Sequence, residues 1–159
     1  MAVAVDDDAS AEGLVAHLQG LGFSLRLSLE QTALNRLATV RVLPPGEPEE
    51  GIVIDLLFAS SAIEPEICME AEEIEIVPGL VVPVARAGHL VATKLLALSP
   101  DRPQDEGDLR VLLERLTPED HARAVSAVAR IEHLGANRGK SLRRELDQRV
   151  RRRGADGFH

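Results

Sequence analysis

The sequence predicts a mixed α/β domain of the α+β class, with a sheet in the first half of the chain and helices in the second. Three observations lead to this prediction. Between residues 23 and 58, apolar residues alternate with polar ones or form short apolar runs, as in strands. From residue 87 onward, apolar residues recur at helical spacing between proline and glycine breaks. Strands and helices segregated in this way are typical of α+β proteins.

The expected elements of the first half begin with an apolar run of strand length, Met1–Val5. Asp6, Asp7, Asp8 and Ser10 then offer N-cap side chains for a helix that ends near Gly20. A half-buried strand follows, with Phe23, Leu25, Leu27 and Leu29 on one face. The remaining expected elements are a strand at 37–43, a loop at 44–51, a strand at 52–58 and a short helix at 65–71.

The expected elements of the second half are two short strands and then four helices. Proline and glycine at positions 78, 79, 100, 103, 118 and 135 separate most of them. The strands are 74–77 and 81–84, and the helices are 87–98, 104–116, 118–134 and 140–152.

Composition indicates a soluble globular protein. Apolar residues make up 45% and charged residues 28% of the 159 residues, and no apolar run reaches the ~18 residues of a membrane span. No basic segment precedes an apolar one at the N-terminus, so no secretory signal is expected. Cys68 is the only cysteine, which excludes an internal disulfide and predicts a buried apolar role. We therefore expect a cytoplasmic location.

The charge distribution divides the chain. Residues 1–137 hold 10 basic and 23 acidic side chains, a balance of −13, whereas residues 138–153 hold eight basic and two acidic ones. We therefore predict a domain at 1–137 and a basic C-terminal helix and tail at 138–159. With three Phe and no Trp or Tyr, any nucleic-acid contact would be electrostatic and salt-sensitive. A solvated helix end, or a contact with the acidic body, is the alternative for the tail.

Asp55 is the first candidate for a functional site. It interrupts the apolar run 52–58, where a charge is costly unless it is paired or bound to a cation. One hypothesis is a metal-binding or general-base carboxylate that points into a cleft. The other is an ion pair with an arginine such as Arg36 or Arg41. Both stay open at this point.

Lys94 is the second candidate, with Asp105 and Asp108. The chain has only two Lys beside 16 Arg, and Lys94 lies on the apolar face of its helix. A desolvated lysine needs a carboxylate partner and also suits a phosphate. Asp105 and Asp108 are three residues apart and share a helix face, so they are the expected partners. Capping of the helix start is the alternative for these two acids.

Two further candidates are expected to have structural roles. Asp6, Asp7 and Asp8 point in different directions, which favours turn and capping roles over a magnesium site. His89, at the start of a helix, is expected to be solvated or capping rather than a proton-transfer group.

Several stretches of the sequence form a recognisable set: VIDLLFASS at 53–61, IEPEI at 63–67, VARAGHL at 84–90, KLLA at 94–97 and RPQDEGDL at 102–109. Together they resemble nucleotidyltransferase-like proteins of the AbiEii/AbiGii toxin family, over about residues 1–135. The resemblance implies a nucleotidyltransferase-like sheet and transfer of a nucleotidyl group from an NTP with Mg²⁺. It also implies that Asp55 is a metal-binding catalytic carboxylate, and that Lys94, Asp105 and Asp108 lie near the nucleotide or substrate.

The sequence departs from this family at its beginning. The glycine-rich turn and the Asp-x-Asp pattern, which in the family run into an apolar strand like residues 2–5, have no counterpart here. We therefore expect a chain truncated within its catalytic strand, with weak or absent Mg²⁺ binding and no activity alone. The full-length form is expected to act on tRNA, another RNA or another acceptor, and to have a cognate antitoxin protein as a partner. The alternative is a non-catalytic binding or toxin–antitoxin partner domain that kept the fold.

Overall fold

The computed structural model describes residues 1–31 and 35–156, and it confirms the predicted α+β class. The chain forms two compact units, Met1–Met69 and Glu70–His159, which we call the sheet unit and the helical unit. This division differs from the predicted one at 137/138. The basic C-terminal helix belongs to the helical unit, because Leu142 and Leu146 have no exposed surface and the helix contacts three others.

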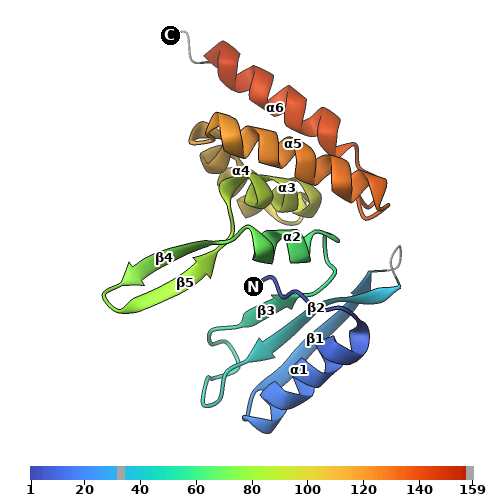
Figure 1. The fold of residues 1–159 in the computed structure, drawn as a ribbon, viewed down its shortest axis with the longest axis vertical. Coiled ribbons are helices and arrows are strands. Elements are labelled where there is room, and N and C mark those ends of the chain that lie inside the picture. Colours follow the sequence, from blue (N-terminus) through green and yellow to red (C-terminus); the bar gives the residue numbers. More distant parts are fainter. Residues whose placement is uncertain (32–34, 157–159) are drawn as a thin grey trace. The chain divides into compact units, whose positions relative to one another are not determined.

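The sheet unit consists of a helix, an antiparallel sheet with the strand order β1-β2-β3, and a second short helix (Figure 1). The elements are α1 (Asp8–Gly20), β1 (Ser24–Gln31), β2 (Arg36–Leu43), β3 (Ile54–Leu57) and α2 (Glu64–Met69). As expected, an aspartate caps α1: the Asp7 carboxylate accepts a hydrogen bond of 2.8 Å from the Ser10 amide.

The core of this unit lies between α1 and one face of the sheet. Val40 and Val42 of β2 and Leu56 of β3 are buried there against Ala11 of α1. Arg41 and Asp55 are direct cross-strand partners and alternate with these residues. Since successive side chains of a strand point to opposite faces, Arg41 and Asp55 lie on the face away from α1.

Two expected strands differ from the structure. Residues 1–5 make only an isolated parallel bridge between Ala2 and Leu57, with the Val3 amide 2.9 Å from the Leu57 carbonyl oxygen. The prediction that Leu25 and Leu27 share a face was wrong: Leu25 pairs with Val42 and Leu27 with Arg41. An irregularity in register between them places one extra residue in β1, and a single extra residue switches the face.

The helical unit contains a hairpin followed by four helices (Figure 1). The elements are β4 (Glu72–Val77), β5 (Leu80–Val84), α3 (Ala87–Ala97), α4 (Pro103–Glu114), α5 (Pro118–His133) and α6 (Leu142–Asp156). Helix α3 is central, since it contacts α4, α5 and α6, and Val91, Ala92 and Leu95 have no exposed surface. Within residues 1–31 and 35–156, no helix has the length and apolarity to cross a membrane.

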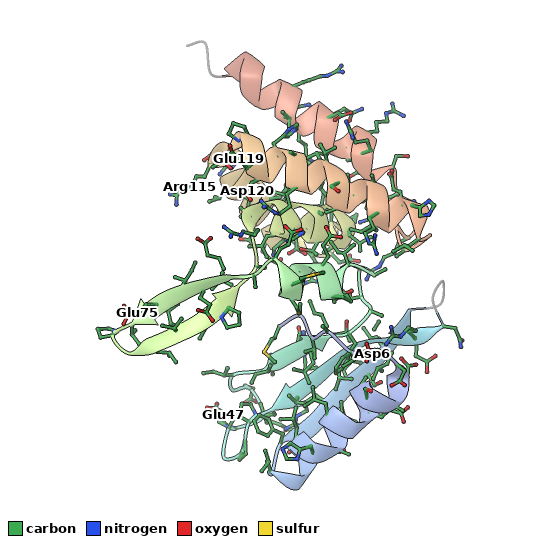
Figure 2. All side chains as sticks on the ribbon, in the orientation of Figure 1. Asp6, Glu47, Glu75, Arg115, Glu119 and Asp120 are labelled. Carbon is green, nitrogen blue, oxygen red and sulfur yellow. The ribbon has the colours of Figure 1, made fainter. Side chains whose placement is uncertain are left out.

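Gly88 sets the close approach of α3 to α5. A Cβ atom at this position would lie 2.4 Å from the Asp120 carbonyl oxygen and 2.8 Å from the Arg123 Cβ atom. The Gly88 amide also donates a 3.4 Å hydrogen bond to Asp120 Oδ1. Asp120 lies at the start of α5 (Figure 2). A side chain here would therefore push two packed helices apart.

Replacing Gly88 with alanine should lower the free energy of unfolding by about 1–3 kcal/mol, the usual cost of overpacking. Gly107→Ala is the matched control, because Gly107 is exposed in α4 and its Cβ atom would meet nothing within 4 Å. This control should stabilise the protein by up to about 1 kcal/mol through helix propensity. Urea unfolding of both variants measures the difference, and equal stability of the two would contradict the close contact.

Candidate functional site

Asp55 forms a bidentate ion pair with Arg41 on the open face of the sheet. Arg41 Nε lies 2.6 Å from Asp55 Oδ1, and Arg41 Nη2 lies 2.8 Å from Oδ2. The side chains are 42% and 37% exposed, respectively. The hydrogen bond and the charge of Asp55 raise the pKa of Arg41 above its usual value. Of the two arginines expected as partners, Arg41 is therefore the one used, while Arg36 pairs with Asp8 at 3.3 Å.

This arrangement explains how a carboxylate is tolerated within an apolar run. The neighbouring apolar residues Ile54 and Leu56 belong to the core beneath the sheet, whereas Asp55 points to the other side. The nearest strand positions on its face are Arg41 and Thr39 of β2, Leu27 of β1 and Leu57 of β3 itself, none of which is a carboxylate. These residues do not fit a magnesium ion by themselves, because Mg²⁺ needs more oxygen ligands and would compete with a guanidinium for the carboxylate.

Replacing Asp55 with asparagine should change the free energy of unfolding by less than about 1 kcal/mol, the range of half-exposed ion pairs. A thermal or urea unfolding curve measures this change. A loss of several kcal/mol would instead mean that the pair is a buried structural element.

Lys94 joins α3 to α4 through two carboxylates. Its Nζ atom lies 2.7 Å from Asp105 Oδ1 and 2.7 Å from Asp108 Oδ2. The Asp105 side chain is only 2% exposed, whereas that of Asp108 is 57% exposed. Arg102 Nε approaches Asp105 Oδ2 to 3.2 Å, but in a geometry that makes an ion pair without a hydrogen bond. The expected pairing of Lys94 with both aspartates is therefore present.

The electrostatics of this cluster keep Lys94 charged. Burial is the largest single influence and lowers its pKa, but the hydrogen bonds and charges of Asp105 and Asp108 together raise the pKa above 10.5. The stabilisation is thus fully present below pH 10.5 and is lost as the pH rises through the higher folded-state pKa. Capping, the alternative for the two acids, is not their role, because Arg102 is the N-cap of α4 and no side chain caps it.

Lys140, the only other lysine, donates hydrogen bonds to backbone carbonyl groups at the C-terminal end of α3. Its Nζ atom donates to the carbonyl oxygens of Leu95, Leu96 and Leu98 at 3.4, 2.7 and 2.5 Å. Burial is the main influence on its pKa, which is lowered. An ammonium group has three protons, so Lys140 has none left for a ligand. This role of Lys140 was not predicted from the sequence, although the scarcity of lysine was a signal for it.

The burial of two polar side chains, His89 and Glu64, was not predicted from the sequence. The expectation that His89 is solvated or capping was wrong: it has no exposed surface, since α3 is buried on most of its sides. Glu64, which was not singled out, is 1% exposed and accepts hydrogen bonds from the Ser61 amide and hydroxyl at 2.7 and 2.9 Å. The spacing of Ser61 and Glu64 is that of a capping box and could have identified this pair.

The candidate residues fall into two groups. Asp55 belongs to the sheet unit, while Lys94, Asp105 and Asp108 belong to the helical unit and form one cluster. No protein-family model matches the sequence, and a comparison with curated proteins finds no match either. The function is therefore inferred from these two groups of residues.

Replacing Lys94 with methionine should cost roughly 3 kcal/mol of unfolding free energy, because it leaves the buried Asp105 without its hydrogen-bonded cation. Asp108→Asn is the matched control at the exposed end of the same cluster and should cost less than about 1 kcal/mol. Urea unfolding at pH 7 compares the two. If both variants lost equally little, Asp105 would not depend on Lys94.

Proposed function

We propose that the chain is a nucleotidyltransferase-fold protein whose full-length form transfers a nucleotidyl group from an NTP to an RNA, such as tRNA, or to another acceptor. In the same proposal, residues 1–159 alone are inactive, the setting is the cytoplasm, and an antitoxin protein is a partner. The carrying observation is the position of Asp55. A half-exposed carboxylate on the sheet face opposite α1 is accessible to a ligand, which a core carboxylate is not.

The segment at residues 1–3 supports this proposal. It runs parallel to β3, with the Leu57 amide 2.8 Å from the Met1 carbonyl oxygen. In the resembling family, the corresponding apolar strand directly follows the Asp-x-Asp pattern. Carboxylates on such a strand would lie beside Asp55, which by itself makes no magnesium site.

The second candidate function is a non-catalytic binding domain. One specific observation favours it: each candidate side chain is already engaged by an opposite charge. Arg41 occupies both oxygens of Asp55, and Lys94 is shared between Asp105 and Asp108. Such pairing is expected of a fold that has kept its framework and lost its chemistry.

The test combines the intact mass of the native protein with an assay for transfer of radiolabelled nucleotide to RNA in the presence of Mg²⁺. We expect a longer native protein that transfers nucleotide, residues 1–159 without activity, and a loss of at least roughly 100-fold in Asp55→Asn of the longer form. Glu50→Gln, an exposed loop acid, is the control and should leave the activity unchanged. A native protein that begins at Met1 and binds no NTP with Mg²⁺ would refute nucleotidyl transfer and favour the binding domain.

A further inference from the structure

The β4–β5 hairpin of the helical unit exposes an unusual amount of apolar surface. All six residues of β4 are exposed, and those of β5 are exposed or half-exposed. Five large apolar side chains, 41–55% exposed, lie in these two strands: Ile74, Ile76, Val77, Leu80 and Val81. A two-stranded hairpin is marginally stable by itself, and exposed apolar patches commonly mark interaction surfaces. We therefore expect a partner to bind the β4–β5 hairpin and to cover part of this apolar surface.

The strand pairing indicates which edge can accept that partner. Glu73 is the cross-strand partner of Pro83, which has no amide hydrogen to donate to β4. This position therefore suits a non-hydrogen-bonded pair, in which the amide and carbonyl groups of both residues point outward. The outer edge of β4 thus presents free hydrogen-bonding groups at Glu73 and, two residues later, at Glu75. On the outer edge of β5, Pro83 breaks the row of donors.

The side chains along β4 define the chemistry of the partner. Glu73 and Glu75 share one face, whereas Ile74 lies on the other face beside Val82. The Glu73 side chain has no hydrogen bond or ion pair within the described part of the chain. The Glu75 carboxylate, near the tip of the hairpin (Figure 2), accepts a 2.8 Å hydrogen bond from the Gly79 amide. A strand added to this edge would meet the carboxylates of Glu73 and Glu75 on one face. On the other face it would meet Ile74, and Glu72 there is already paired with Arg86.

We propose that the outer edge of β4 binds an extended segment of a partner protein in which lysine or arginine alternates with apolar residues. The basic residues pair with Glu73 and Glu75, the apolar residues pack beside Ile74, and the backbone extends the hairpin to three strands. A second copy of this chain is a poor occupant, because pairing of β4 with β4 brings glutamates together. This inference does not rest on nucleotidyl transfer.

The test uses a fluorescent peptide of four Lys-Val repeats as the probe and a Glu-Val peptide of the same length as its control. Fluorescence anisotropy should show binding of the Lys-Val peptide only. Hydrogen exchange followed by NMR should show slower exchange of the Glu73 and Glu75 amides when that peptide is present. Neither readout involves a nucleotide, so failure of the nucleotidyl transfer proposal would not affect the result.

Two substitutions separate the backbone from the charge. Glu73→Pro removes an outward amide without removing a β4–β5 hydrogen bond, and should weaken peptide binding at least about tenfold. Glu73→Lys should weaken binding roughly three- to tenfold by reversing a cross-strand charge pair. Glu50→Gln, in a loop of the sheet unit, should bind as the unchanged protein does.

Three results would overturn the proposal. Equal binding of the two peptides would show that the carboxylates do not select the partner. Unchanged binding by Glu73→Pro would place the peptide elsewhere. The third result is a dimer, measured by light scattering, that the Glu73→Pro substitution dissociates and the Lys-Val peptide does not. Such a dimer would mean that a second copy of the chain occupies the edge.

Discussion

The burial of the Asp105 carboxylate is the constraint on which the helical unit depends. A carboxylate that is almost fully removed from water requires a cation, and Lys94 supplies it from the neighbouring helix. This pair fixes α4 against α3, while Gly88 allows α5 to approach α3 from another direction. Lys140 then satisfies carbonyl groups at the end of α3. Both lysines of the unit thus contribute to interactions of α3, Lys94 from within it and Lys140 at its C-terminal end.

In the sheet unit, the alternation of side chains along the strands decides where the charged residues lie. Helix α1 covers one face of the sheet, so the residues between the core positions point away from it. Arg41 and Asp55 occupy that second face as direct cross-strand partners, half-exposed and mutually neutralised. This geometry leaves the Asp55 carboxylate partly solvated in the folded protein and accessible to a ligand. A catalytic carboxylate and a carboxylate that only forms an ion pair would therefore both need this position on the sheet face opposite α1.

Local sequence signals predicted most of the fold. Helices α3, α4 and α5 begin and end within about two residues of the expected bounds, because proline and capping residues act locally. The irregular register of β1 escaped prediction, since it depends on pairing with β2. The partners of Lys94 were predicted because they lie close in sequence and share a helix face. The burial of His89 was not, because it depends on packing against elements distant in sequence.

The engagement of both lysines has a consequence for covalent chemistry on this protein. In acylation, an unprotonated and accessible lysine amine is the nucleophile that attacks the acyl donor. Lys94 resists such attack because its neighbours keep it protonated, and Lys140 resists it because three carbonyl oxygens surround its nitrogen. Arginine supplies nearly all other positive charge in the chain. The folded protein therefore offers lysine-directed modification, such as acetylation or ubiquitin attachment, almost no side chain on which to act.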